Sequence, residues 1–214
     1  MANNQRASRW WRGMGQRQVN PKSGVLLHIT SLPAPHGIGD LGPQARQFAD
    51  WAANAGCAAW QVLPINPIGE GNSPYSGRSA FAIEPLLMSL EDLHADGLLP
   101  RRALAADALL KSGPCRYAAA RRFKAPRIHR AFASFASSGG LRQAAFRRFA
   151  DAQSHWLEAW CDDQPGEPDE LAFVQYKLNE QWLRLRKHAK KQGVSFIGDV
   201  PIFVHADSTD VRQH

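Results

Sequence analysis

The residues best suited to chemistry accompany the last apolar run of the sequence, FIGDVPIFV, at residues 196–204. Asp199 lies inside this run, and His205, Asp207 and Asp210 come just after it. We expect the run to form a buried strand, in which an ionised carboxylate is costly unless it is paired or hydrogen-bonded. The sequence therefore predicts a partner for Asp199, either an arginine or a ligand hydroxyl, and it leaves structural and functional roles open.

A second group of candidates lies in a long loop, NPIGEGNSPYSGRSAFAIEP, at residues 66–85. Loops of this length inside a compact domain are usually functional or disordered, and the aromatic residues Tyr75 and Phe81 argue against disorder. Hydroxyl, amide and carboxylate groups supply the hydrogen bonds that sugar hydroxyls need, and aromatic rings stack on sugar faces. The loop, with Ser73 and Tyr75, and the carboxylate of Asp199 therefore suit a carbohydrate ligand.

Three other kinds of site receive little support from the motifs. His205-x-Asp207, joined by His28, could indicate a metal site, but scattered histidines are more often ordinary polar neighbours, so we expect no metal. The glycines in HGIGDLG and PIGEGNS match neither the dinucleotide-binding nor the P-loop fingerprint. None of the serines lies in a G-x-S-x-G nucleophile elbow.

The apolar pattern predicts an α/β fold with parallel strands. Apolar runs of strand length lie at 24–29, 58–65 and 194–204, and helical periodicity marks 43–55 and 169–192. A strand, a loop, a helix and a second strand in this order form a βαβ unit, whose strands are parallel. Runs that stay apolar throughout indicate strands covered on both faces. Ligands of such folds bind at the C-terminal ends of the strands, where the candidate residues lie.

The remainder of the chain divides into an arm and an insertion. Residues 1–22 hold five basic residues and no acidic one, and we expect them to form a disordered or weakly ordered arm. Residues 86–168 show helical segments broken by glycine and proline and no convincing strand, so we interpret them as an inserted helical subdomain. The α/β part would then comprise residues 23–85 and 169–214.

The composition indicates a soluble, cytoplasmic protein. The 214 residues are 44% hydrophobic, and no apolar stretch approaches the roughly 20 residues of a membrane span. The three cysteines are widely spaced, which favours reduced thiols.

The net charge of +7 comes from residues 1–22 and 111–150. These segments could attract nucleic acid, but no nucleic-acid-binding motif accompanies them, and we favour a solvated helical face without such a partner.

Three blocks of the sequence carry a resemblance to a known family. LLHITSLPAPHGIGDLG, WQVLPINPIGEGNSPYSGRSAFAIEP and FIGDVPIFVHADSTDV follow one another in the order found in the 4-α-glucanotransferase or amylomaltase family. That family belongs to the α-amylase clan of (β/α)8 barrels, and the likeness covers about 24–95 and 170–211 closely. It implies an N-terminal, roughly three-stranded part of such a barrel, for which we expect apolar surface at the two open sheet edges.

The resemblance also implies a reaction and a set of binding residues. The family transfers a segment of an α-1,4-glucan to another glucan or to glucose by a retaining double displacement, without metal or organic cofactor. Ser73 and Tyr75, in the matched SPY motif, would line the donor-side sugar subsites. Asp199 would lie beneath the catalytic centre and pair with an arginine from a later strand. Glu70 stands where some members have an aromatic residue that contacts glucan, which puts that contact in doubt.

The resemblance assigns no catalytic residue within this chain. The nucleophile and the acid/base glutamate of the family lie on later strands, beyond residue 214, so we expect a truncated chain that is inactive alone. Asp207 and Asp210 cannot inherit those roles. Other hypotheses are a non-catalytic α-glucan-binding fragment and another hydrolase of the same clan, such as a debranching enzyme, which the SPY motif disfavours.

Overall fold

The computed structural model describes residues 22–111, 113–202 and 205–213. Except for Lys22, the predicted basic arm lies outside these residues. The helices and strands follow in the order β1 (Gly24–Leu26), α1 (Pro43–Asn54), β2 (Ala59–Gln61), α2 (Leu90–Ala95), α3 (Ala108–Lys111), α4 (Tyr117–Ala136), α5 (Leu141–Asp163), α6 (Pro168–Lys191), β3 (Ser195–Ile197) and α7 (Thr209–Gln213). Four short 3-10 helices lie at Ile29–Ser31, Pro85–Leu87, Glu70–Asn72 and Arg101–Leu104.

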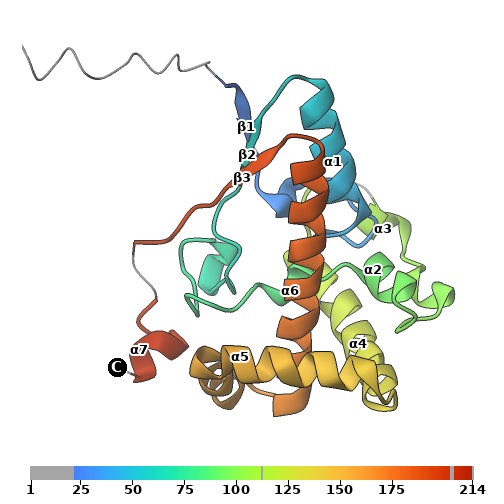
Figure 1. Cartoon of the computed structure of the whole chain (residues 1–214), viewed down its shortest axis with the longest axis vertical. Coiled ribbons are helices and arrows are strands. Elements are labelled where there is room, and N and C mark those ends of the chain that lie inside the picture. The colour runs from blue at the N-terminus through green and yellow to red at the C-terminus, as the bar shows by residue number, and fades with distance from the viewer. Residues whose placement is uncertain (1–21, 112, 203–204, 214) are drawn as a thin grey trace, which may run out of the picture.

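The three strands form one parallel sheet in the order β1-β2-β3 (Figure 1). Trp60, at the centre of β2, is in register with Val25 of β1 and with Phe196 of β3. The indole Nε1 of Trp60 donates a hydrogen bond to the carbonyl of Leu27 at 2.8 Å, and its ring is fully buried. The predicted α/β fold with parallel strands is therefore confirmed.

All three strands are shorter than the apolar runs that predicted them. β1 ends at Leu26, because the chain then turns into the 3-10 helix at Ile29–Ser31. β2 ends at Gln61, shortly before Pro64, which has no backbone N–H to donate to a neighbouring strand. β3 ends at Ile197, just before a glycine. Apolar content thus marked where the strands lie but overestimated their lengths.

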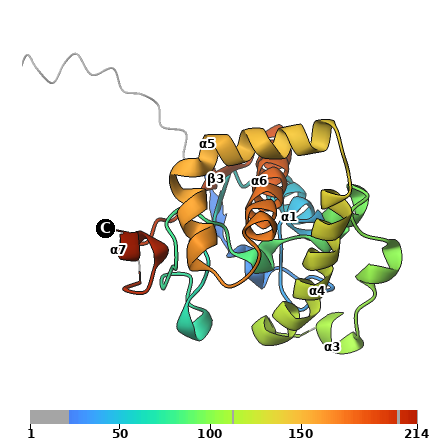
Figure 2. The same ribbon diagram turned by 90° about the horizontal axis from the view of Figure 1, so that it is seen from below.

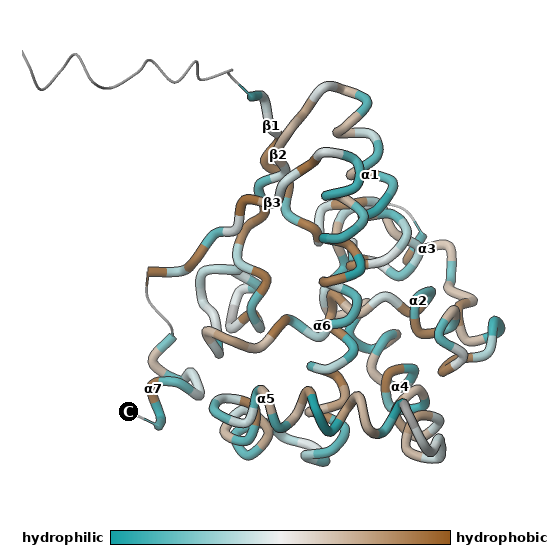
Figure 3. Tube along the Cα trace, in the orientation of Figure 1, coloured by the Kyte–Doolittle hydropathy of each residue, from teal (hydrophilic) through white to brown (hydrophobic). Residues whose placement is uncertain are grey.

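Several apolar side chains near the sheet are exposed. Leu26 and Ile197, at the strand ends, are 58% and 48% exposed, and beyond β3 the values rise to 81% for Val200 and 90% for Ile202. Figure 3 shows the stretch after β3 with brown, hydrophobic segments on both sides of a teal, hydrophilic one. In the part of the chain that the structure describes, no strand pairs with the outer edge of β1 or β3. The prediction of strands covered on both faces is therefore wrong here, and the expectation of open apolar edges is confirmed.

Helix α6 forms the centre of the hydrophobic core. It stands upright in the middle of Figure 1, and it packs against α1, α4, α5 and β3. Figure 2 shows the same helix end-on, with α5 lying across it. The stripe predicted from the sequence supplies four fully or nearly fully buried residues, namely Val174, Leu178, Leu185 and Ala189. The periodicity of this segment therefore predicted both the helix and its buried face.

Two glutamines of α6 hold the end of the long loop and the segment that follows it. The side-chain amide of Gln175 accepts a hydrogen bond from the backbone N–H of Ile83 at 2.8 Å and donates one to its carbonyl at 3.0 Å. Gln181 makes the same pair of bonds with Ser89, at 2.8 and 3.0 Å. Buried backbone N–H and carbonyl groups need hydrogen-bond partners, and no described strand supplies them here. Each glutamine amide therefore bonds both the N–H and the carbonyl of one residue.

The helices of the segment 86–168 share a core with the sheet. Ile128, Ala131 and Phe135 of α4 belong to the same buried cluster as Trp60 and Phe173. None of the helices that the structure describes is both long and apolar enough to cross a membrane.

Candidate functional site

A backbone bridge and side-chain hydrogen bonds hold the base of the loop after β2. Ile68 and Gly77 form an isolated antiparallel bridge, which brings the two arms of the loop together. The buried carboxylate of Glu84 accepts hydrogen bonds from the backbone N–H groups of Ile68, at 2.9 Å, and Leu86, at 3.1 Å. Burial raises the pKa of Glu84, while these two bonds and the nearby Arg121 oppose that shift. The loop is thus held by specific contacts, as its predicted functional role requires.

Ser73 and Tyr75 lie at the tip of this loop. The Ser73 hydroxyl oxygen accepts a hydrogen bond from the backbone N–H of Tyr75 at 3.3 Å, and the Ser73 carbonyl accepts one from Ser76 at 3.2 Å. This turn presents the Tyr75 ring outward, with 51% of the residue exposed. The expectation for Glu70 concerns a side chain outside the part that the structure describes.

Tyr75 and Asp199 meet although 124 positions separate them in the sequence. The tyrosine hydroxyl donates a hydrogen bond of 2.6 Å to Oδ2 of Asp199. This bond, with smaller contributions from desolvation and the carboxylate charge, raises the pKa of Tyr75. Asp199 follows the end of β3 and is partly exposed, so its predicted place inside a buried strand is wrong. Its described partner is a hydroxyl of the chain, and pairing with a later arginine stays a prediction.

A hollow of about 310 Å³ lies beside this pair. Tyr75 and Asp199 supply its polar wall, and Val200, Pro201 and Ile202 supply an apolar wall. Small-molecule sites combine an apolar lining with a few polar groups in this way. The apolar wall was not foreseen as a binding surface, because its residues were expected to be buried in a strand.

His28 lines a second, smaller hollow at the C-terminal ends of β1 and β2. This hollow has room for about one water molecule or hydroxyl group, and its polar lining includes Asn66, Asn72, Glu84 and Tyr117. Burial lowers the pKa of His28, which favours the neutral imidazole. Its Nδ1 atom is buried and has no hydrogen-bond partner among the described residues. His28 can therefore accept a hydrogen bond from a group that enters this hollow.

The polar residues after β3 connect the last segment to the loop. Oδ2 of Asp210 accepts a hydrogen bond from the backbone N–H of Ala80 at 2.9 Å. The backbone N–H of His205 donates a hydrogen bond to the Gly77 carbonyl at 3.1 Å. Oδ2 of Asp207 lies 3.8 Å from Nδ1 of His205, and its side chain is 80% exposed. Asp210 and His205 thus have structural contacts that bring α7 to the loop.

Replacing Asp199 with asparagine should lower the pKa of Tyr75, because the substitution removes the charged acceptor that stabilises the protonated phenol. Alkaline titration of the tyrosinate absorbance should show one of the three tyrosines ionising at lower pH than in the unchanged chain. Asp207→Asn is the matched control and should leave the titration unchanged. An identical titration curve for Asp199→Asn would show that the hydrogen bond does not form in solution.

The chain is similar to several known proteins. A family model described as 4-alpha-glucanotransferase matches residues 27–164 and 159–214. The chloroplastic/amyloplastic 4-alpha-glucanotransferase of Arabidopsis thaliana is 33% identical over 236 residues, which cover 94% of this chain and 41% of that protein. The 4-alpha-glucanotransferase of Synechocystis is 35% identical over 223 residues, which cover 88% of this chain and 44% of that protein. The chain thus spans about two fifths of the length of these curated relatives.

The match to a solved structure also covers only part of that protein. The amylomaltase from Streptococcus agalactiae, solved in complex with acarbose, superposes with a TM-score of 0.79 at 24% identity, over 88% of this chain and 45% of that one. This likeness concerns the fold, which is that of part of an amylomaltase. The family is shown by the family match over most of the chain and by the curated relatives. The chain belongs to the 4-alpha-glucanotransferase family.

Proposed function

We propose that this chain forms the donor-side wall of an enzyme that transfers a segment of a 1,4-α-glucan to the 4-position of another glucan or of glucose. The observation that carries the proposal is the Tyr75–Asp199 pair, held at the strand ends beside a hollow that is apolar on one side. An exposed aromatic ring next to a carboxylate is an arrangement that binds pyranose rings and their hydroxyls. Family membership supports the same function.

Each of the three binding residues has a distinct proposed role. The ring of Tyr75 stacks on a glucose face, and its oxygen keeps a lone pair for a sugar hydroxyl while it donates to Asp199. Asp199 accepts hydrogen bonds from sugar hydroxyls and fixes the tyrosine. The Ser73 hydroxyl accepts the Tyr75 N–H, so its own hydrogen stays available for a sugar oxygen.

The proposed reaction is a retaining double displacement, which needs a carboxylate nucleophile and a second carboxyl group as acid/base. We assign neither role to a residue of this chain. Asp210 serves a structural contact and Asp199 holds Tyr75, and the proposal assigns the catalytic pair to parts of the fold that the relatives have beyond the matched region. The chain alone should therefore transfer no glucan.

A chimera tests the proposal. In it, this chain replaces the matched region of the Synechocystis relative, which supplies the rest of the fold. We expect the chimera to release glucose from maltotriose, and we expect Tyr75→Ala to lower this rate by more than about tenfold, as loss of a stacked sugar contact would. Phe81→Ala, at another exposed ring of the same loop, is the control. A folded chimera without activity would refute the proposal.

A second candidate function is glucan binding without catalysis. The exposed Tyr75 ring beside the hollow favours it, because this surface is present in the chain itself. Calorimetric titration of the purified chain with maltoheptaose should then give heat that Tyr75→Ala abolishes. The absence of heat at millimolar ligand would exclude this function and leave the chimera result unaffected.

We also propose a cytoplasmic location and α-glucan and glucose as partners, with no nucleic acid or membrane partner. All three cysteines are free, as predicted, and reduced thiols are typical of the cytoplasm. Cys161 is buried, and desolvation with two nearby carboxylates raises its pKa to about 11, so it is an unreactive thiol at neutral pH.

A further inference from the structure

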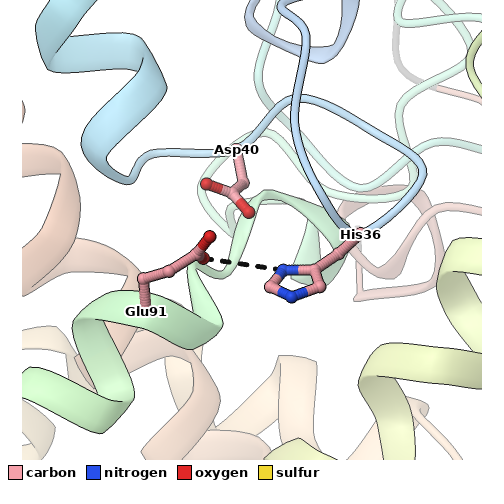
Figure 4. Close-up of side chains that lie close together, drawn as sticks. All are labelled: His36, Asp40 and Glu91. Carbon is pink, nitrogen blue, oxygen red and sulfur yellow. Dashed lines mark ion pairs between the residues drawn. The ribbon is translucent and has the colours of Figure 1, made fainter. Parts of the chain in front are cut away.

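Three potential metal ligands come together at residues that do not line the hollow beside Tyr75 and Asp199. His36 and Asp40 lie on the loop between β1 and α1, and Glu91 lies in the first turn of α2 (Figure 4). One ligand atom from each residue lies within 4.8 Å of the other two. His36 and Asp40 are 1% and 0% exposed, and the Glu91 side chain is 21% exposed. The cluster is thus largely removed from solvent.

The imidazole of His36 is oriented as a metal-binding histidine would be. Its Nε2 lies 3.2 Å from the carbonyl of Leu104 and donates to it, so that in the neutral ring Nδ1 is the acceptor. Histidine ligands of metals usually donate their other ring nitrogen to a carbonyl or carboxylate in this way. The ring also stacks on Phe123, with centroids 5.2 Å apart. Burial lowers the pKa of His36, so the neutral form that binds metals is favoured.

The Nδ1 atom points at Glu91 without a hydrogen bond. It lies 3.5 Å from Oε2 of Glu91, and it has no hydrogen-bond partner among the described residues. Two ligands of a tetrahedral zinc ion lie roughly 3.4 Å apart when each bond is about 2.1 Å. The observed separation therefore fits a cation between the two atoms better than a direct hydrogen bond.

The two carboxylates of the cluster differ in their partners. Lys124 bonds Oδ2 of Asp40 at 2.9 Å, and the Gly42 N–H donates to Oδ1 of Asp40 at 3.0 Å. Within the described chain, the only basic group at ion-pair distance from Glu91 is the His36 ring, and the Ser89 hydroxyl lies 3.5 Å from the same Oε2 atom. Glu91 thus has no lysine or arginine partner among the described residues.

We propose that His36, Asp40 and Glu91 bind a zinc ion that ties the β1–α1 loop to α2. An imidazole nitrogen and two carboxylates are ligands that zinc accepts, and a water molecule would complete four-fold coordination. Lys124 keeps its bond to Asp40 and sets the orientation of that carboxylate. None of the three residues lines the hollow beside Tyr75 and Asp199, and the proposed glucan transfer requires no metal, so we assign the zinc ion no part in that reaction.

The test uses zinc on the purified full chain after treatment with a chelator and desalting. We expect a single bound zinc ion by mass spectrometry of the metal content, together with a raised thermal midpoint. His36→Gln and Glu91→Gln should each weaken zinc binding by more than about tenfold. His129→Gln and Glu170→Gln are the matched controls, because they alter an exposed His–Glu pair 2.8 Å apart, and they should bind zinc normally.

Cobalt provides a readout on the unchanged chain, independent of the folding of any variant. Co²⁺ in the proposed site should give the intense visible absorption of four-coordinate cobalt, and one equivalent of Zn²⁺ should abolish it. Weak absorption typical of six-coordinate cobalt would overturn the proposal, as would zinc binding that His36→Gln and His129→Gln reduce equally.

Discussion

Replacing Lys124 with methionine should lower the free energy of unfolding by about 3–5 kcal/mol, the usual cost of breaking a buried ion pair. The Lys124 side chain is 1% exposed, and Nζ bonds Asp40 at 2.9 Å and the carbonyls of Leu86 and Met88 at 2.8 and 2.9 Å. Methionine has similar length and no donor. It would leave a buried carboxylate without its cation and two carbonyls without partners.

Urea denaturation measures this change, with a chelator present so that no metal ion can replace the ammonium group. Arg122→Met, an exposed position on the same helix, is the control and should change the free energy by less than about 0.5 kcal/mol. Adding Asp40→Asn to Lys124→Met should recover part of the loss, because a neutral amide is cheaper to bury than a carboxylate. A loss below about 1 kcal/mol for Lys124→Met would contradict the buried network.

The second large effect is expected for Gln181→Leu. Gln181 is fully buried, and its amide satisfies both the N–H and the carbonyl of Ser89. Leucine fills a similar volume but leaves the Ser89 N–H without a partner, whereas the Ser89 carbonyl keeps its hydrogen bond from the Leu93 N–H at 3.2 Å. The stability loss should therefore reach about 1–3 kcal/mol, although the substitution makes the side chain more hydrophobic.

Gln47→Leu provides the comparison, because Gln47 is exposed on α1 and should tolerate the change. Hydrogen exchange adds a local readout: the amide of Ser89 should exchange faster in Gln181→Leu than in Gln47→Leu. Equal stability of the two variants, with unchanged protection of Ser89, would show that the glutamine amide is not what holds this segment.

Much of the fold could be predicted from local patterns. The stripe of α6 and the apolar runs of the strands reflect burial, and burial leaves a periodic signal in sequence. Strand ends were missed because pairing depends on neighbouring segments. Val200 and Ile202 look like strand interior by composition, yet no described strand pairs with the outer edge of β3. The apolar pattern predicts which side chains would be buried in a complete sheet, but it does not show whether a neighbouring strand is present to bury them.

The candidate site was predicted in part. Ser73, Tyr75 and Asp199 came from a family resemblance, but the hydrogen bond between the last two joins residues far apart in the chain. No local pattern encodes such a pairing. The burial of Lys124 was missed for a different reason. It lies in the basic segment 111–150, which the sequence suggested to be a solvated helical face, and a run of like charges does not show which member is buried.

The most direct test of the proposed function follows labelled glucose. When the chimera acts on maltotriose in the presence of ¹³C-glucose, we expect the label at the reducing end of longer glucans, joined through an α-1,4 bond. That product requires transfer with retention, and hydrolysis cannot form it. Release of unlabelled glucose with all the label remaining in free glucose would identify a hydrolase and contradict glucanotransferase function.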